Sequence, residues 1–112
     1  MQLKPIKIGK HIIKYPIFQG GMGVGISWDK LAGSVSKEGA LGIVSAVGTG
    51  YYKQMHFTQK LVNLKPFEAI NFYSKQALQE IIKNARKLCG DNPLGVNILY
   101  AINEIRIENP FH

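Results

Sequence analysis

The stretch PIFQGGMGVG, residues 16–25, decides the fold class because a short apolar run passes directly into a run of glycines. Such a run predicts a buried strand over residues 16–19, which opens into a loop where the backbone turns sharply or closely approaches another group. Beyond the loop, apolar residues recur at helical spacing on one face: Trp28, Leu31, Ala32 and Val35. They predict a helix over residues 27–38, with Ser27 accepting a backbone N–H bond as its N-cap.

Two further apolar runs continue the pattern. They span residues 40–46 and residues 94–99, and each is nearly continuously apolar. Such a run predicts a strand that is covered on both faces, as in parallel sheets flanked by helices. Between them, residues 74–88 place apolar side chains on one helical face and lysines and glutamine on the other, which predicts an amphipathic helix. Residues 48–70 lack clean periodicity and predict a long excursion with room for a helical turn.

The order of the expected elements is strand, helix, strand, helix, strand, without hairpin signals between them. This order predicts right-handed βαβ units, and hence an α/β fold with parallel strands and flanking helices. Residues 1–15 alternate short apolar and basic segments around Pro5 and Gly9. Such a segment suits a lead-in hairpin or a plug over one end of the sheet.

The composition is that of an ordinary soluble globular domain, with 46% hydrophobic and 19% charged residues in a chain of 112. No apolar run approaches the roughly 18 residues needed to cross a bilayer. The first residues place charges and prolines where a signal peptide needs its apolar centre. We therefore expect a cytoplasmic protein that binds no membrane.

Neither a metal nor a nucleic acid is expected as a partner. Cys89 is the single cysteine, and the histidines lack the spacing of metal ligands: His11, His56 and His112. The net charge is +7, but the lysines are spread over the whole chain. Only Arg86 and Arg106 offer the guanidinium group that base recognition prefers.

A glycine-rich loop after a strand has three common interpretations, and two of them fail here. A dinucleotide fingerprint lacks its third glycine, because the two possible frames end on Ile26 and Trp28. A P-loop is excluded because the only Gly-Lys pair, Gly9-Lys10, precedes His11 rather than Ser or Thr. The third interpretation is a barrel whose strand ends face a flat cofactor, where glycines let backbone amides approach the ring.

Three blocks of sequence carry a resemblance to a known family. Residues 16–23, 31–44 and 94–98 resemble, in order and spacing, the N-terminal part of nitronate monooxygenases, also called 2-nitropropane dioxygenases. The related flavin-dependent enoyl-ACP reductases look similar over the same blocks. The resemblance extends over roughly residues 14–103 and implies the N-terminal part of an FMN-dependent TIM (β/α)₈ barrel. The implied activity is oxidation of small nitronates with oxygen, and the alternative on the same scaffold is reduction of an enoyl thioester.

The resemblance also implies the residues that contact the cofactor. Those expected against the flavin ring of FMN are Gly20, Gly21, Met22 and Gly23, while Asn97 would hydrogen-bond the ring. An amide offers both donor and acceptor to the polar ring edge, and methionine offers a polarizable contact. Plainer interpretations are a tight turn for the glycines, a satisfied strand end for Asn97 and core packing for Met22. No catalytic residue is predicted.

The end of the sequence departs from the family pattern, because residues 104–112 do not resemble the expected continuation. A closed barrel takes about 250 residues. Residues 1–112 are therefore interpreted as a single partial domain, a truncated piece of about three βα units with an atypical tail. We expect this chain alone to be inactive and to lose FMN, since the phosphate-binding loops of such barrels come later. A non-enzymatic basic fragment is the alternative outside the enzyme classes, and no oligomeric state is predicted.

Overall fold

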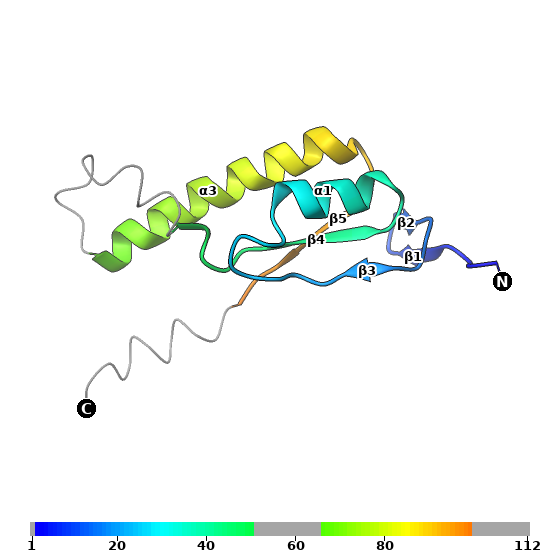
Figure 1. Ribbon diagram of the computed structural model, residues 1–112, viewed down its shortest axis with the longest axis horizontal. Helices are drawn as coiled ribbons and strands as arrows, with labels where there is room; N and C mark the ends of the chain where they lie inside the picture. Colours follow the sequence, from blue (N-terminus) through cyan, green and yellow to red (C-terminus); the bar gives the residue numbers. More distant parts are fainter. Residues whose placement is uncertain (1, 51–65, 100–112) are drawn as a thin grey trace, which may run out of the picture.

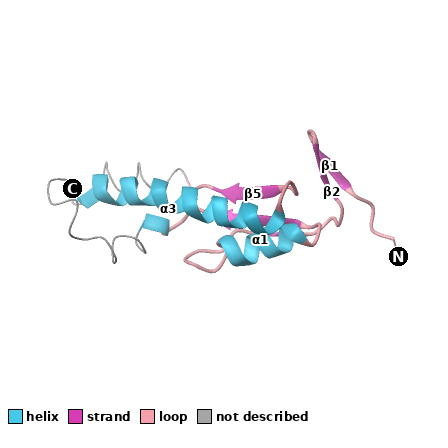
Figure 2. Ribbon diagram, turned by 90° about the horizontal axis from the view of Figure 1, so that it is seen from above, coloured by secondary structure: helices cyan, strands magenta, loops and turns pink. Residues whose placement is uncertain are grey.

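The computed structural model describes residues 2–50 and 66–99. Its elements are β1 (Ile6–Ile8), β2 (His11–Ile13), β3 (Phe18–Gln19), α1 (Asp29–Lys37), β4 (Leu41–Ser45), α3 (Pro66–Cys89) and β5 (Leu94–Asn97). Figure 1 shows two layers, in which α1 and α3 lie over one face of the sheet formed by β3, β4 and β5. Seen from above, both helices cover the same side of the strands (Figure 2). The α/β class predicted from the element order is confirmed.

The sheet is parallel, with β4 in the middle and β3 and β5 on either side of it. Phe18 pairs with Leu41 across one edge of β4, and Gly42 pairs with Leu94 across the other. The prediction of three neighbouring parallel strands is therefore confirmed, although each strand is shorter at its ends than the sequence pattern predicted.

Helix α1 packs closely against both β4 and α3, and a glycine lies at each of the two contacts. A β-carbon at Gly42 of β4 would lie 2.8 Å from Cα of Ala32, and one at Gly33 would lie 3.1 Å from Cα of Ala85 on α3. The backbone of α1 thus contacts both the strand and the neighbouring helix. The core lies at this contact and consists of fully buried Ala32, Val44 and Ala85, with Leu78, Ile81 and Leu94 packed around them.

The start of α1 differs from the prediction. Trp28, not Ser27, is the N-cap residue, and no side chain caps the first turn. The Ser27 hydroxyl instead donates a hydrogen bond to the backbone oxygen of Ile43 on β4. The predicted cap is wrong because a distant strand offers Ser27 a buried acceptor, which local sequence does not reveal.

Helix α3 begins earlier than its apolar periodicity indicated, at Pro66. Residues 66–70, which the sequence pattern placed in the connection with room for a helical turn, form the beginning of α3 instead. Proline suits the first turn of a helix, because its φ is already helical and its missing N–H would be unpaired there. Of the rest of the predicted connection, residues 48–50 turn and begin a helix, and residues 51–65 lie outside the described residues.

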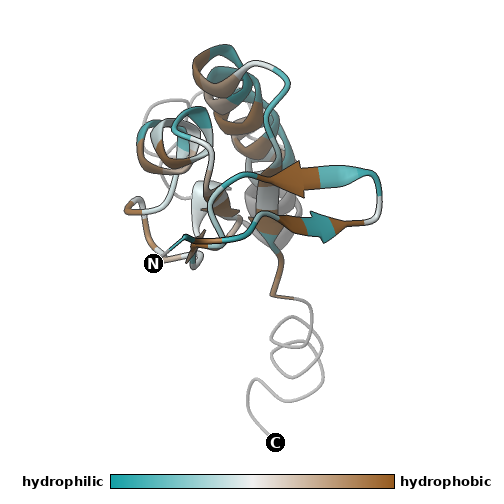
Figure 3. Cartoon of the chain, turned by 90° about the vertical axis from the view of Figure 1, so that its right-hand side faces the viewer, coloured by the Kyte–Doolittle hydropathy of each residue, from teal (hydrophilic) through white to brown (hydrophobic). Residues whose placement is uncertain are grey.

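Strands β1 and β2 form the predicted hairpin, which is antiparallel and pairs Ile6 with Ile13. Its turn contains Gly9, whose φ of 58° lies in the left-handed region that favours glycine. Figure 3 views the molecule from the end where this hairpin lies. Ile13 is only 1% exposed, and it lines a small pocket together with Leu41 and Leu94, which begin β4 and β5. Of the two expected arrangements, the structure shows the lead-in hairpin, which lies beside the amino ends of β4 and β5 across this pocket.

Two polar side chains join the carboxyl ends of the helices near the same end of the sheet. Arg86 Nη1 donates to the backbone oxygens of Gly90, at 3.0 Å, and Asn92, at 2.6 Å. The Asn92 amide in turn donates to the oxygen of Ser36 in α1, at 2.9 Å. The Arg86 bonds hold the turn that follows α3, and the Asn92 bond joins this turn to the last turn of α1, where the Ser36 oxygen also accepts from Gly39 N–H at 3.1 Å.

No helix within the described ranges is long and apolar enough to cross a membrane. The same residues hold no group of three His, Cys, Asp or Glu side chains that could bind a metal ion. Cys89 is buried at the end of α3.

Candidate functional site

The carboxyl ends of the three parallel strands meet at one edge of the sheet, which is where ligands of parallel α/β folds bind. Ser45 at the end of β4 pairs with Asn97 at the end of β5, and Ala46 N–H donates to the Asn97 oxygen at 3.1 Å. Strand β3 ends at Gln19 and leads into residues 20–26, which we call the glycine loop.

The two faces of the sheet differ in what covers them. Gly42 and Val44 of β4 point toward the helices, because the first contacts Ala32 and the second belongs to the core. Side chains alternate along a strand, so Ile43 and Ser45 belong to the other face, which we call the open face. Neither α1 nor α3 covers the open face (Figure 1).

The glycine loop leaves the sheet at Gln19 and returns to it at Ser27. Leu41 N–H makes a regular ladder bond to the Ile17 oxygen, at 2.9 Å. The next ladder donor, Ile43 N–H, bonds to the side-chain Oε1 of Gln19 instead, at 3.2 Å. One rung further, Ser45 N–H bonds to the backbone oxygen of Ser27, at 2.8 Å. Residues from both ends of the loop therefore continue the ladder that β3 begins.

The loop folds onto the open face beside Asn97. A β-carbon added to Gly21 would lie 2.9 Å from Cβ of Asn97 and 3.7 Å from Cγ2 of Ile43. A β-carbon added to Gly23 would lie 3.4 Å from Oγ of Ser45. The structure thus brings three of the residues singled out in the sequence, Gly21, Gly23 and Asn97, to one place. The Asn97 side chain lies on the open face, away from the helices.

The other two predicted residues, Gly20 and Met22, do not pack against that cluster. Met22 is 42% exposed, so it is not a core residue. A β-carbon at Gly20 would meet nothing within 4 Å, and its φ lies outside the left-handed region. Neither close packing nor backbone conformation in the described structure therefore explains why position 20 holds glycine.

Three polar residues at this edge were not among the predicted cofactor contacts: Gln19, Ser27 and Ser45. Ser27 is 0% exposed and Ser45 is 2% exposed, and Gln19 Nε2 donates to Oγ of Ser27 at 2.8 Å. A polar residue that ends an apolar strand was the available signal for Gln19. The described polar side chains here are amides and hydroxyls, which can orient a ligand by hydrogen bonds but exchange no proton near neutral pH.

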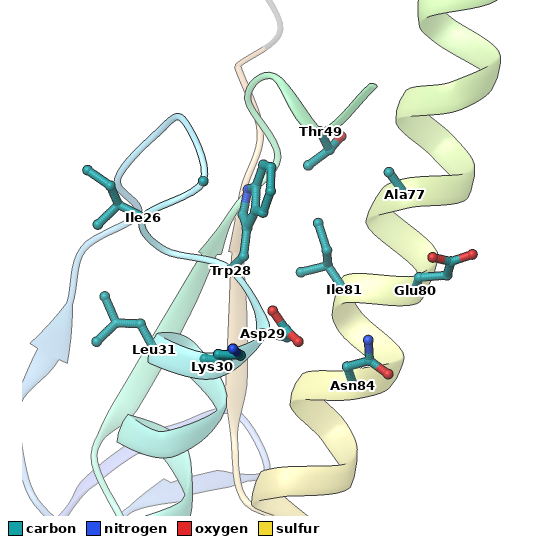
Figure 4. Close-up of a pocket in the computed structure, with 11 residues that line it drawn as sticks. Ile26, Trp28, Asp29, Lys30, Leu31, Thr49, Ala77, Glu80, Ile81 and Asn84 are labelled. Atoms are coloured by element: carbon teal, nitrogen blue, oxygen red, sulfur yellow. The ribbon is translucent and has the colours of Figure 1, made fainter. Parts of the chain in front are cut away.

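A separate pocket of 570 Å³ lies on the helix side of the sheet (Figure 4). It lies between the start of α1 and the middle of α3, with Trp28 and Ile81 as apolar walls and Asp29 and Asn84 as polar ones. None of the five predicted cofactor contacts lines it. The pocket therefore adjoins the end of the glycine loop, through Gly25 and Ile26, but Asn97 does not line it.

The sequence model of one protein family, described as nitronate monooxygenase, matches residues 4–110. A search of curated proteins found no match to the chain.

Proposed function

Because the chain belongs to the nitronate monooxygenase family, we propose that its glycine loop and Asn97 contact the flavin ring of FMN. The enzyme would oxidise small nitronates with oxygen. The fold corresponds to part of a (β/α)₈ barrel, whose interior would be the open face of the sheet. The observation that carries the proposal is the contact between Gly21 and Asn97 beside a Gly20 that has open space next to it.

The residues at this edge fit a flat heterocycle with polar edges. Gly20 and Gly21 carry no side chain, so a ring can approach the loop backbone closely. The Asn97 amide can donate to a ring oxygen or nitrogen and accept from a ring N–H. Exposed Met22 offers an adaptable apolar contact to the ring face. FMN, when bound, supplies the acceptor for the electrons of the nitronate.

The described residues would hold the ring rather than the phosphate. In barrels of this kind the phosphate binds near the loops after the seventh and eighth strands, which are not among the three described here. Each hydrogen bond to the ring contributes about 1 kcal/mol net, while association costs several kcal/mol. The 112-residue chain should therefore bind FMN weakly, lose it on gel filtration and turn over no nitronate.

Replacing Gly20 by alanine tests the assignment directly. The methyl group meets no protein atom within 4 Å, so the free energy of unfolding should change by no more than about 0.5 kcal/mol. In a barrel that carries these blocks together with its remaining strands, the affinity for FMN, measured by quenching of flavin fluorescence, should fall roughly tenfold, because the methyl would occupy space that the ring needs. Wild-type affinity in Gly20→Ala would contradict the assigned contact.

The reaction itself is tested on a barrel that carries these blocks together with its remaining strands. Nitronate-dependent oxygen uptake supports the proposed activity. NADH-dependent reduction of an enoyl thioester, without nitronate turnover, would assign the scaffold to the reductases instead.

A further inference from the structure

Two side chains take the place of the ladder that β3 does not continue. The N–H of Ile43 bonds to Oε1 of Gln19 at 3.2 Å, and the backbone oxygen of Ile43 accepts from the Ser27 hydroxyl. The same hydroxyl oxygen accepts from Gln19 Nε2 at 2.8 Å. Gln19 Nε2 also donates to the oxygen of Gly20. One amide and one hydroxyl therefore connect both ends of the glycine loop to the middle strand.

The loop between them needs such connections. Four of the seven residues from 20 to 26 are glycine, and glycine loses the most backbone freedom when it is held in one conformation. Ser27 N–H donates to the Met22 oxygen at 2.9 Å, which closes the loop on itself. Ser27 is 0% exposed, so its bonds do not compete with bulk water.

We propose that Gln19 and Ser27 are positioning residues that hold the glycine loop against Asn97 in the conformation that receives the flavin ring. This inference rests on the proposed function. Neither side chain need contact the ring, because each acts through the loop backbone. Holding the loop in its binding conformation beforehand lowers the entropy that ligand binding would otherwise cost.

The experiment compares three variants of the full chain with the wild type. Ser27→Ala removes the hydroxyl that bonds to Ile43 and Gln19. Gln19→Met removes both polar atoms of the amide at similar length, and it provides a second variant if Ser27→Ala does not fold. Ser34→Ala is the matched control, because Ser34 is an exposed serine on α1, away from the loop.

Amide hydrogen exchange measures, without any ligand, how firmly the hydrogen bonds hold the loop. In Ser27→Ala the amides of Ser27 and Ser45 should exchange roughly tenfold faster, as expected for the loss of about two hydrogen bonds. In Gln19→Met the amide of Ile43 should likewise exchange roughly tenfold faster. Amides in the middle of α3 should keep their wild-type rates in every variant. Unchanged exchange at Ser27, Ser45 and Ile43 would overturn the inference.

FMN binding then reports the position of the loop, in the same variants of a barrel that carries these blocks together with its remaining strands, because the 112-residue chain alone should hold FMN too weakly to be saturated. Affinity should fall roughly tenfold in both variants and stay at the wild-type value in Ser34→Ala. The visible circular dichroism of FMN at saturation should also change, whereas a variant that merely lowered the folded fraction would leave the saturated spectrum unaltered. Faster exchange with unchanged affinity and spectrum would overturn the positioning role. Failure of the wild type to bind FMN would instead contradict the proposed function. The exchange rates, which are measured without FMN, would still test whether the two side chains hold the loop.

Discussion

Replacing Gly42 by alanine should separate α1 from the sheet. A β-carbon at position 42 would lie 2.8 Å from Cα of Ala32, and ordinary contact begins at 3.4 Å. The obstructing atoms belong to the backbone, so no side chain can rotate away. Helix α1 would have to retreat by at least 0.6 Å, and the retreat would open the core formed by Ala32, Val44 and Ala85.

The expected loss is at the upper end of the range for overpacked cores, about 3 kcal/mol in the free energy of unfolding. Small domains have only about 5–15 kcal/mol in total. With a urea dependence of about 1.5 kcal/mol per molar, the midpoint of unfolding should fall by about 2 M. Gly33 constrains α1 from its other side, where a β-carbon would lie 3.1 Å from Cα of Ala85, so the helix has little room to shift.

The assay is urea unfolding followed by far-UV circular dichroism and by the fluorescence of Trp28, the single tryptophan of the chain. Gly20→Ala is the matched control, because the same substitution meets nothing within 4 Å there. It should leave the midpoint within about 0.3 M of the wild type, as expected for a substitution in open space. A Gly42→Ala midpoint as close to the wild type as that of the control would refute the direct packing of α1 on β4.

Two further predictions concern the carboxyl ends of the helices. Asn92→Ala should lower the free energy of unfolding by about 1–2 kcal/mol, because it removes the 2.9 Å bond to the Ser36 oxygen at the end of α1. Asn84→Ala, an exposed change on α3, is the control, and equal stability of the two variants would refute the role of Asn92. Gly90→Ala should cost about 1 kcal/mol because φ at Gly90 is 61°, and Gly90→Asn should cost less. Equal thermal midpoints of the Ala and Asn variants would contradict this explanation.

The fold class could be predicted because hydrophobic patterning is a local property. The continuous apolar run over residues 40–46 predicted a strand between helices, and Val44 is indeed buried under them. The start of α3 could also have been predicted from Pro66, but the sequence before it has no clean periodicity, which obscured that signal. The close packing of α1 on the sheet could not be predicted, because Gly33 and Gly42 matter only where α1 packs against β4 and α3.

Part of the site could also be predicted from the sequence. Gly21 and Asn97 were singled out by resemblance to a family, and the structure places them in contact. The bonds of Gln19 and Ser27 depend on the register between strands more than twenty residues apart, as the separation of 24 residues between Gln19 and Ile43 shows. Ser27 was taken for a helix cap because nearby sequence favours that role. Local sequence carries no information on which distant carbonyl a buried hydroxyl will find.

The closure of the glycine loop has a consequence for how such a site can vary. The chain leaves the sheet at Gln19 and rejoins it at Ser27, and their side chains meet at 2.8 Å. The segment between them is therefore an excursion that returns to its starting point, and its length and composition do not set the register of β3 on β4. Insertions or exchanges within it would reshape what the protein recognises while the strands, helices and core keep their places. The ligand preference of the site and the stability of the fold could then change independently of each other.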